Sequence, residues 1–210
     1  MSTLAELRGE LRLLLNDDTA EGYLWSDATL NMHLDDAIRE YSRSFPRQRE
    51  ATLATVAGQS AYDLPADCLS VARVDAVETH GRTPLLPGTG DESGSTAGAG
   101  RYEVYDGKLI LLPTPTESGT SIAVRYLAPH AGLVSDADPC TVPDADEDLL
   151  LTCAGSRVLQ ALLTEDAKRR RFEARSGQPA RAVANLYREQ YERGIRLRTA
   201  TIRAGRLVLP

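Results

Sequence analysis

The residues of this chain that could do chemistry are few and widely spaced. His33, His80 and His130 are isolated from one another, with no His-Glu-x-x-His pattern and no second histidine at helical spacing. Each is therefore predicted to be a surface or packing histidine. The three cysteines are far apart, odd in number and without Cys-x-x-Cys spacing, so neither a disulfide framework nor a zinc site is indicated.

Two further stretches resemble reactive motifs without matching them. The Gly- and Ser-rich segment 87–100 lacks the Gly-Lys-Ser/Thr ending of a phosphate-binding loop, and no Gly-x-Ser-x-Gly elbow occurs. The acidic segment 135–148, "SDADPCTVPDADED", lacks the glycine and the closing glutamate of a calcium loop, so a helix N-terminus and a solvated acidic face explain it better. We therefore expect no catalytic residues, no metal site, no cofactor and no enzymatic activity. A metal-dependent hydrolase built on 135–148 stays as a third hypothesis.

The charges are divided unevenly along the chain. Residues 1–164 hold 12 Lys/Arg against 25 Asp/Glu, whereas residues 165–210 hold 12 against 5. An acidic body with a basic C-terminal arm suits contact with an acidic neighbour or with nucleic acid. Arginines that merely cover the exposed face of a last helix would give the same pattern.

Within the basic arm, "KRRRFEAR" is the densest patch of positive charge. We expect it to contact a neighbouring subunit or a partner through Lys168, Arg169, Arg170, Arg171 and Arg175. Sequence-specific DNA reading is not expected, because aromatic residues make up only 5% of the chain and no helix-turn-helix pattern accompanies the patch.

The elements that would carry these residues begin with helices. Leucines at three- and four-residue steps after Thr3 predict a short amphipathic helix ending near Asn16. Ser26 is then placed as the N-cap of a second helix, which Pro46 closes. The apolar stripe of this second helix is Leu30, Leu34, Ala37, Ile38, Tyr41 and Phe45.

The middle of the chain has the pattern of short strands. "ATLATVA", "SAYDL", "CLSVARVDAVE" and "SIAVRYLAP" are rich in β-branched and apolar residues, and the bend "DLPAD" separates the second from the third. Asp106-Gly107 between apolar runs predicts a hairpin. Segment 87–100 has no large apolar side chains and is expected to be a flexible loop.

Helix is predicted again after Pro143. Leu149 to Leu163 give an apolar helix, which residues 164–175 are expected to prolong through Glu165–Arg169 and Asp166–Arg170 pairs. Ser176-Gly177 ends it, and a last helix runs to Ile195.

Together these patterns predict an α+β fold of one compact unit. Helical segments 1–50 and 131–198 form a bundle built from both termini, and 51–130 forms an inserted, small antiparallel β-sheet or sandwich. Residues 199–210 are expected to form an extended C-terminal tail. No run of eighteen apolar residues and no signal-like leader is present, so we expect a soluble, cytosol-made protein without membrane contact.

The order of the motifs resembles one protein family. "LAELRGELRLLLND", "LWSDATLNMHLDDAIREYSRSFP", "GQSAYDLPADCLSVARV", "YEVYDGKLILLPTP", "IAVRYLAP" and "VPDADEDLLLTCAGSRVLQ" together are similar to the adaptor (connector) proteins of tailed-phage heads, with relatives among tail tubular proteins and gene transfer agent adaptors. The resemblance spans about residues 4–195.

This resemblance implies a structural virion protein at the head–tail junction, assembled in the cytoplasm of the host bacterium. It implies a homo-oligomeric ring, usually twelve-fold, that docks on the phage portal protein, meets a stopper, tail or nozzle protein below, and lets genomic DNA pass without specific binding. The tail would reach the portal through Ile202, Arg203, Arg206, Leu207, Val208, Leu209 and Pro210. The alternative hypothesis is a nucleic-acid-binding accessory protein acting through the basic C-terminal arm.

Overall fold

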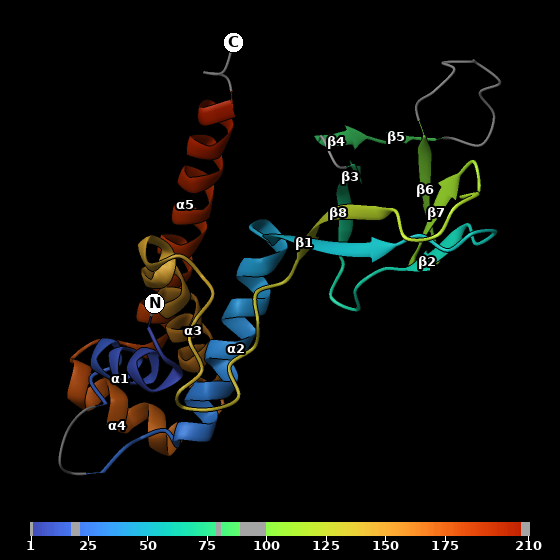
Figure 1. The fold of residues 1–210 in the computed structure, drawn as a ribbon. Coiled ribbons are helices and arrows are strands. Elements are labelled where there is room, and N and C mark those ends of the chain that lie inside the picture. The colour runs from blue at the N-terminus through green and yellow to red at the C-terminus, as the bar shows by residue number, and fades with distance from the viewer. Residues whose placement is uncertain (1, 18–21, 79–80, 89–99, 207–210) are drawn as a thin grey trace. The chain divides into compact units, whose positions relative to one another are not determined.

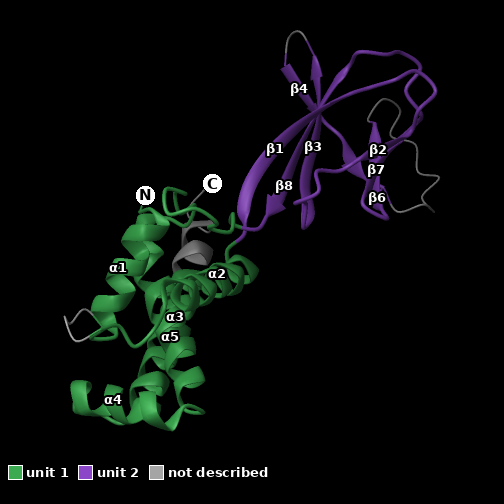
Figure 2. Cartoon of the chain, turned by 90° about the horizontal axis from the view of Figure 1, so that it is seen from below, with its two compact units in different colours: residues 1–45, 130–210 green, residues 46–129 purple. Residues whose placement is uncertain are grey.

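The computed structural model describes residues 2–17, 22–78, 81–88 and 100–206, with the backbone alone for 201–206. It is an α+β fold, as the sequence predicts. The chain divides into two compact units: a helical unit of residues 1–45 and 130–210, and a β unit of residues 46–129 (Figure 2).

The β unit is inserted into the helical unit at a single place. Within the helical unit the two ends of the insertion meet, because the His130 ring nitrogen Nε2 lies 3.0 Å from the carbonyl oxygen of Phe45. The backbone N–H of His130 also donates to Ser42 Oγ at 3.0 Å. Within the β unit, the first strand residue, Arg47, is paired with Ala128. His130 is thus a packing residue that closes the helical unit, in agreement with the sequence-based prediction.

The helical unit contains the elements α1 (Leu4–Leu14), α2 (Asp27–Ser44), the 3₁₀ turn η1 (Asp144–Asp146), α3 (Glu147–Leu162), α4 (Asp166–Ser176) and α5 (Ala180–Arg206) (Figure 1). Local chemistry fixes where the first two helices begin. Thr3 and Glu6 form a reciprocal capping box at α1, and Ser26 Oγ accepts from the Thr29 N–H at α2.

One core joins the helices from the two ends of the sequence. It is built mainly from leucines of α1 and α2 and apolar residues of α3, with Tyr191 of α5 and Phe172 of α4. The ring of Phe172 meets that of Trp25 edge-on, with centroids 6.1 Å apart. Bundle formation by both termini therefore follows from the apolar stripes that the sequence shows.

The prediction that residues 164–175 prolong the preceding helix is wrong. The N–H groups of Leu163, Thr164 and Glu165 each bond to the carbonyl three residues earlier, which tightens and ends α3. Glu165 then has φ −113° and ψ 83°, outside the helical region, and α4 starts at Asp166. The break allows Phe172 to reach the core, where it is 2% exposed.

The expected extended tail also differs from the structure. Residues 199–206 continue α5 as helix to Arg206, whereas 207–210 lie outside the described residues. Thr and Ile lower helix propensity by only a few tenths of a kcal/mol each. A helix already nucleated by packing continues through such residues, because elongation costs far less than nucleation.

The described residues of the β unit form two four-stranded sheets. One has the order β1-β8-β3-β4 and the other β2-β7-β6-β5, and every pairing among these strands is antiparallel except β5 with β6. The strands are β1 (Arg47–Ala54), β2 (Ala61–Asp63), β3 (Ser70–Glu78), β4 (Gly81–Pro84), β5 (Leu86–Pro87), β6 (Arg101–Tyr105), β7 (Lys108–Leu112) and β8 (Ser121–Ala128).

The two sheets share one core, formed by Tyr62, Val74, Tyr102, Leu109, Leu111, Ile122 and Val124. The predicted Asp106-Gly107 hairpin joins β6 to β7, and both residues have positive φ, 48° and 71°. Most of the loop expected at 87–100 lies outside the described residues, but its first residue, Pro87, belongs to β5.

Candidate functional site

Helix α5 carries most of the basic C-terminal arm, and contacts with three other elements of the helical unit fix it. A Cβ atom added at Gly194 would lie 2.2 Å from Leu149 Cδ2, so the α5 backbone passes very close to α3. Tyr187 donates from its hydroxyl to the carbonyl of Leu14 at 3.0 Å. Arg188 pairs with Glu40 of α2 at 2.9 Å.

A further ion pair of α5 joins Arg198 to a buried carboxylate, that of Asp146 in η1. Arg198 Nε is 3.1 Å from Asp146 Oδ2, and the Tyr41 hydroxyl donates to the same oxygen at 2.6 Å. Asp146 is 4% exposed, so these two donors take the place of the water that its carboxylate would otherwise bind. Burial, together with the hydrogen bond to Asp146, raises the pKa of Tyr41 well above its usual range, and the phenol therefore stays protonated as a donor.

Beyond Arg198, α5 continues for eight more residues to Arg206 and projects past α3 (Figure 1). This projecting end contains Ile202, Arg203 and Arg206 of the predicted portal-binding tail; their backbone is helical. Leu207, Val208, Leu209 and Pro210 lie outside the described residues. The part of the tail that the structure describes is thus a continuation of a well-anchored helix.

The five basic residues singled out on α4 do not share one environment. Lys168 pairs with Glu165 at 2.7 Å and Arg169 with Asp166 at 2.6 Å. Both pairs are i, i+3, not the i, i+4 pairs expected from the sequence. Because α4 starts only at Asp166, Glu165 is not part of its regular helical face.

The other three residues of the patch divide into two groups. Arg170 and Arg171 are exposed. Arg175 is turned into the helical unit: it donates to the carbonyl of Gly22 at 3.2 Å and lies 3.5 Å from Asp17, with 15% of its side chain exposed. Arg170 and Arg171 are therefore the members of this patch best placed to meet a partner.

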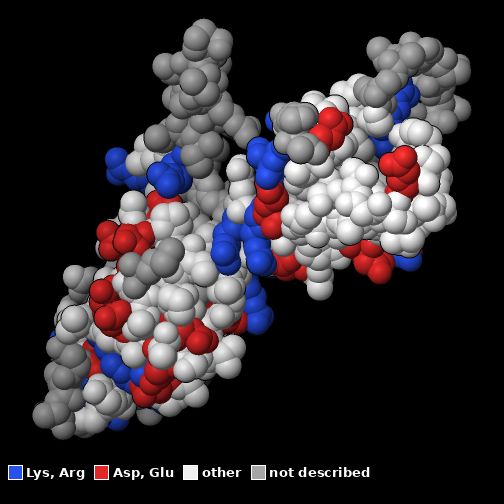
Figure 3. All heavy atoms as spheres, in the orientation of Figure 1, with Lys and Arg blue, Asp and Glu red and all other residues white. Residues whose placement is uncertain are grey.

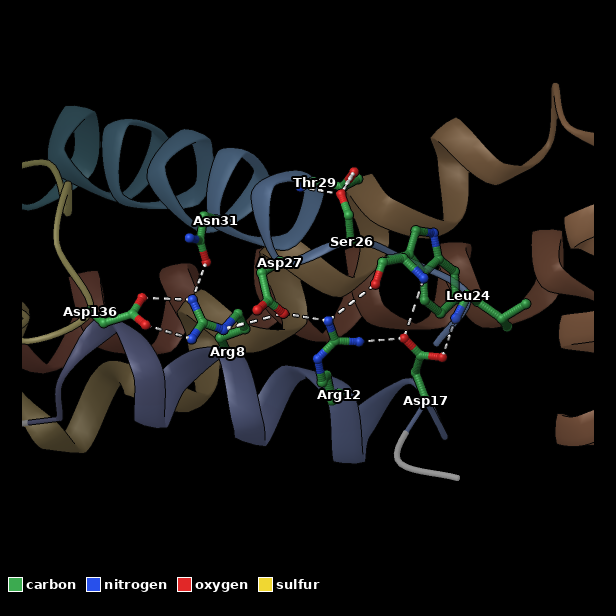
Figure 4. A network of polar contacts seen from close by, with 10 residues as sticks. Arg8, Arg12, Asp17, Leu24, Ser26, Asp27, Thr29, Asn31 and Asp136 are labelled. Atoms are coloured by element: carbon green, nitrogen blue, oxygen red, sulfur yellow. Dashed lines mark hydrogen bonds and ion pairs between the residues drawn. The ribbon is translucent and has the colours of Figure 1, made fainter. Parts of the chain in front are cut away.

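A buried polar network that the sequence did not reveal lies between α1 and α2 (Figure 4). Arg12 contacts Asp17 at 2.7 Å and Asp27 at 2.6 Å, and it donates to the carbonyl of Trp25 at 3.1 Å. Asp17 is 0% exposed and accepts from the N–H of Leu24 at 2.6 Å. The signal that could have found it is Arg12 on the apolar face of α1, since an arginine among core leucines requires a buried acid.

Arg8 extends the same network to the acidic segment that the sequence offered as a cation site. Its guanidinium binds both oxygens of Asp136, at 2.7 and 3.0 Å. Asp138 accepts from the N–H groups of Val134 and Ser135 at 2.8 Å. With Asp146 bound to Tyr41 and Arg198, these carboxylates have structural partners. Over the described ranges, no group of three or more His, Cys, Asp or Glu side chains is arranged to hold a metal ion.

Comparisons with known proteins agree with the family resemblance. A search of curated proteins gave no match. Among the helices described, none combines the length and apolar character needed to cross a bilayer. The model of the SU10 adaptor protein family matches residues 2–209, nearly the whole chain, with both units and the C-terminal helix inside the match. The predicted membership of the phage adaptor proteins is thereby confirmed, and the chain belongs to the SU10 adaptor protein family.

Proposed function

We propose that this protein is the adaptor subunit of a phage head-to-tail connector, a twelve-fold ring that docks on the portal protein and continues the DNA channel toward the tail. The observation that carries the proposal is the family match over residues 2–209. Membership of this family implies a structural role in the virion. The twelve-fold ring, its docking on the portal and its DNA channel go beyond the family match and are proposed.

The portal-binding element in this proposal is the projecting end of α5, together with residues 207–210. The anchoring of α5 through Arg188 and Arg198 supports this assignment, because it holds the helix in a fixed direction up to the point where it leaves the bundle. A preformed helical end loses less conformational entropy on binding than an unstructured tail. Arg203 and Arg206 would meet acidic groups of the portal, and Leu207 to Leu209 would fill an apolar groove.

The lumen of the proposed ring would be lined by the acidic body of the chain. Residues 1–164 carry a net charge of −13, from 12 Lys/Arg and 25 Asp/Glu. Repeated around a ring, this charge repels the phosphates of DNA, so that the duplex slides without specific binding. A stopper, tail or nozzle protein would occupy the opposite end, at the head–tail junction.

A nucleic-acid-binding accessory role through residues 165–210 is the competing hypothesis. Arg175, Arg188 and Arg198 already bind groups of the helical unit, whereas Arg170 and Arg171 of α4 are exposed and could meet phosphate. Phosphate-driven binding would fall steeply with salt, so a titration of duplex DNA at low and high ionic strength separates the two hypotheses.

The proposal is tested by measuring the mass of the protein with its portal. The full chain is expected to bind the portal as a ring of twelve copies. A chain ending at Arg198 loses the helical residues 199–206, and it is expected to keep the thermal stability of the bundle but to lose portal binding. Arg181→Glu is the matched control, because this exposed arginine lies at the opposite end of α5 and its reversal should leave binding intact. Portal binding by the shortened chain at the level of the full chain would contradict the proposal.

A further inference from the structure

The carboxylate of Asp146 joins two helices and does not cap its own. Asp146 is the residue directly before α3, where an aspartate normally accepts a hydrogen bond from an N–H of the first helical turn. Its side chain makes no such bond. The carboxylate accepts instead from the Tyr41 hydroxyl of α2 at 2.6 Å, and it lies 3.1 Å from Arg198 Nε of α5.

Tyr41 fixes the position of this carboxylate. The Tyr41 side chain is 1% exposed, and its ring packs against the rings of Phe45 and His130, with centroids 5.2 and 5.4 Å away. Phe45 and His130 are the two residues of the helical unit that flank the β insertion. Because Tyr41 is held in this way, the Asp146 carboxylate cannot follow a displaced Arg198 without losing a buried hydrogen bond.

Arg198 marks the point at which α5 leaves the bundle. Two earlier contacts hold the helix, from the Tyr187 hydroxyl to the carbonyl of Leu14 and from Arg188 to Glu40. Among the side chains of α5 that the structure describes, Arg198 is the last with a hydrogen bond or ion pair to another element. The helix then continues to Arg206.

Two fixed points along a helix determine its direction, and one does not. Arg188 and Arg198 lie about 15 Å apart along α5, at about 1.5 Å per residue. If Arg188 were the only fixed point, Arg206 would lie at the end of a lever about 27 Å long, and a tilt of about 10° would move it by about 5 Å. Loss of the Arg198 contact therefore changes the position of the helix end most.

The apolar contact between α3 and α5 cannot replace this ion pair. Gly194 lets the α5 backbone approach Leu149 closely. Apolar contacts favour proximity but have no preferred direction. A hydrogen bond between charged groups is short and directional. The direction of α5 beyond the bundle therefore depends on Arg198 and Asp146.

The other arginines on this part of α5 face solvent. Arg193 and Arg196 are exposed, and basic atoms lie on this part of the helix in Figure 3. The side chain of Arg198 is 37% exposed, and that of its partner Asp146 is 6% exposed. A substitution of Arg196 thus changes the charge of α5 by the same amount as a substitution of Arg198, but leaves the contact with Asp146 in place.

We propose that Asp146 is a positioning residue for the portal-binding end of α5: by holding Arg198, it keeps the projecting helix in one direction. The inference rests on the proposed function, which makes this end the contact with the portal. A helix that samples several directions binds only from the fraction of molecules with the correct one, so its apparent dissociation constant rises by the inverse of that fraction. Asp146 acts through Arg198 and does not itself contact the portal.

The first part of the test measures the direction of α5 in the full chain without a portal. Nitroxide labels are attached at Glu10→Cys in α1 and Ala200→Cys in α5, both exposed positions. Cys68 is replaced by Ser, whereas Cys140 and Cys153 are 0% exposed and stay unlabelled. Pulsed electron spin resonance then gives the distribution of distances between the two labels.

The variant to compare is Asp146→Asn. The amide keeps an acceptor for the Tyr41 hydroxyl but loses the charge that faces Arg198. We expect a broader distance distribution than in the unmodified chain. Glu192→Gln is the matched control, because it removes an exposed ion pair, at 2.9 Å from Arg188, that lies entirely within α5. The control should leave the distribution unchanged.

The second part measures the affinity of the same variants, without labels, for the portal. Asp146→Asn is expected to weaken binding about tenfold, which corresponds to about one molecule in ten with α5 in the binding direction. Glu192→Gln should bind like the unmodified chain. If Asp146→Asn does not fold, Arg198→Gln replaces it, with Arg196→Gln as its control and the same two results expected.

Three results would overturn the inference. An unchanged distance distribution, even with a lower unfolding temperature, would show that Asp146 stabilises the bundle without directing α5. A broader distribution with unchanged portal affinity would show that the direction of α5 does not serve binding. Equal broadening in the control would show that any ion pair of α5 has the same effect. Failure of the unmodified chain to bind the portal would refute the proposed function instead, and the distances would still decide whether Asp146 directs α5.

Discussion

Arginine–carboxylate clusters occur in both units of this protein, in opposite surroundings. In the helical unit, Arg12 is 7% exposed and Asp17 is 0% exposed, at 2.7 Å from each other. In the β unit, Glu50 is bound by Arg82 and Arg125 at 2.8 and 3.1 Å, but all three side chains are between 36% and 49% exposed. The chemistry is the same, and only the access of water differs.

That difference decides what each cluster can do. When a buried ion pair loses one partner, the other charge stays buried without water or a partner. The fold therefore depends on both residues of such a pair. Exposed pairs contribute little to stability because water and salt compete with them. Half-exposed arginines, however, keep donors available for a partner. The Arg12 network therefore holds α1 to the start of α2, whereas the Glu50 cluster contributes little to the stability of the β unit.

The largest effect is expected from Asp17→Asn. The substitution keeps the size of the side chain but removes the charge that faces Arg12 and puts an amide in contact with the guanidinium. Removal of one partner of a buried ion pair costs about 3–5 kcal/mol. Scanning calorimetry should show a lower unfolding temperature for the helical unit, and an unchanged temperature would disprove the structural importance of this pair.

A smaller loss is expected from Gly194→Ala in α5. The new Cβ atom would lie 2.2 Å from Leu149 Cδ2, so Leu149 or the helix must shift. Overpacking of this kind costs about 1–3 kcal/mol. Gly9→Ala in α1 is the control, because no atom lies within 4 Å of its Cβ position. It should stabilise the helix by about 0.5–1 kcal/mol, so denaturant unfolding should move in opposite directions for the two variants.

His33 gives the helical unit a predicted dependence on pH. The ring is 8% exposed and its Nδ1 atom has no partner in the described structure. Burial lowers its pKa; the charge of Asp36 opposes this shift and that of Arg157 adds to it. The unfolded chain then binds more protons than the folded chain below about pH 6.5, so the free energy of unfolding falls as pH drops from 7 to 5. His33→Gln should flatten this slope; an identical slope would contradict the prediction.

The smallest effect on stability is expected from Glu50→Gln, which makes in the exposed cluster the change that Asp17→Asn makes in the buried one. The carboxylate of Glu50 is exposed to solvent, so Glu50→Gln should change the unfolding temperature at pH 7 much less than Asp17→Asn does. Because the pKa of Glu50 is lowered to about 2, its contribution is present above about pH 4.3 and is lost as pH falls toward 2. A change as large as that of Asp17→Asn would remove the contrast between the two clusters.

The sequence predicts local features of this fold well and long-range ones poorly. Ser26 at the start of α2 and Asp106-Gly107 in the β6–β7 hairpin are confirmed, because each depends on a few neighbouring residues. The α3–α4 break was missed because it depends on the burial of Phe172 against Trp25, residues far apart in the chain. The helical end of α5 was missed because its Thr and Ile residues favour extended structure only when no packed helix precedes them.

The same limit applies to the candidate sites. A sequence shows a run of like charge such as residues 168–171. It does not show that the side chain of Arg175 turns inward toward Asp17. The meeting of Glu50, Arg82 and Arg125 was not predicted either, because these residues come from three strands, β1, β4 and β8, that the sheet brings together. Family resemblance supplied the function that neither charge nor spacing could specify.

The closure of the helical unit at Phe45 and His130 has a consequence for how such chains diversify. Those two residues already touch, so a short turn between them would complete the bundle and leave its leucine core untouched. The strands between them are one continuous insertion in the chain, residues 46–129. A chain in which an insertion of different size replaces these strands is expected to keep the same helical core and the same α5.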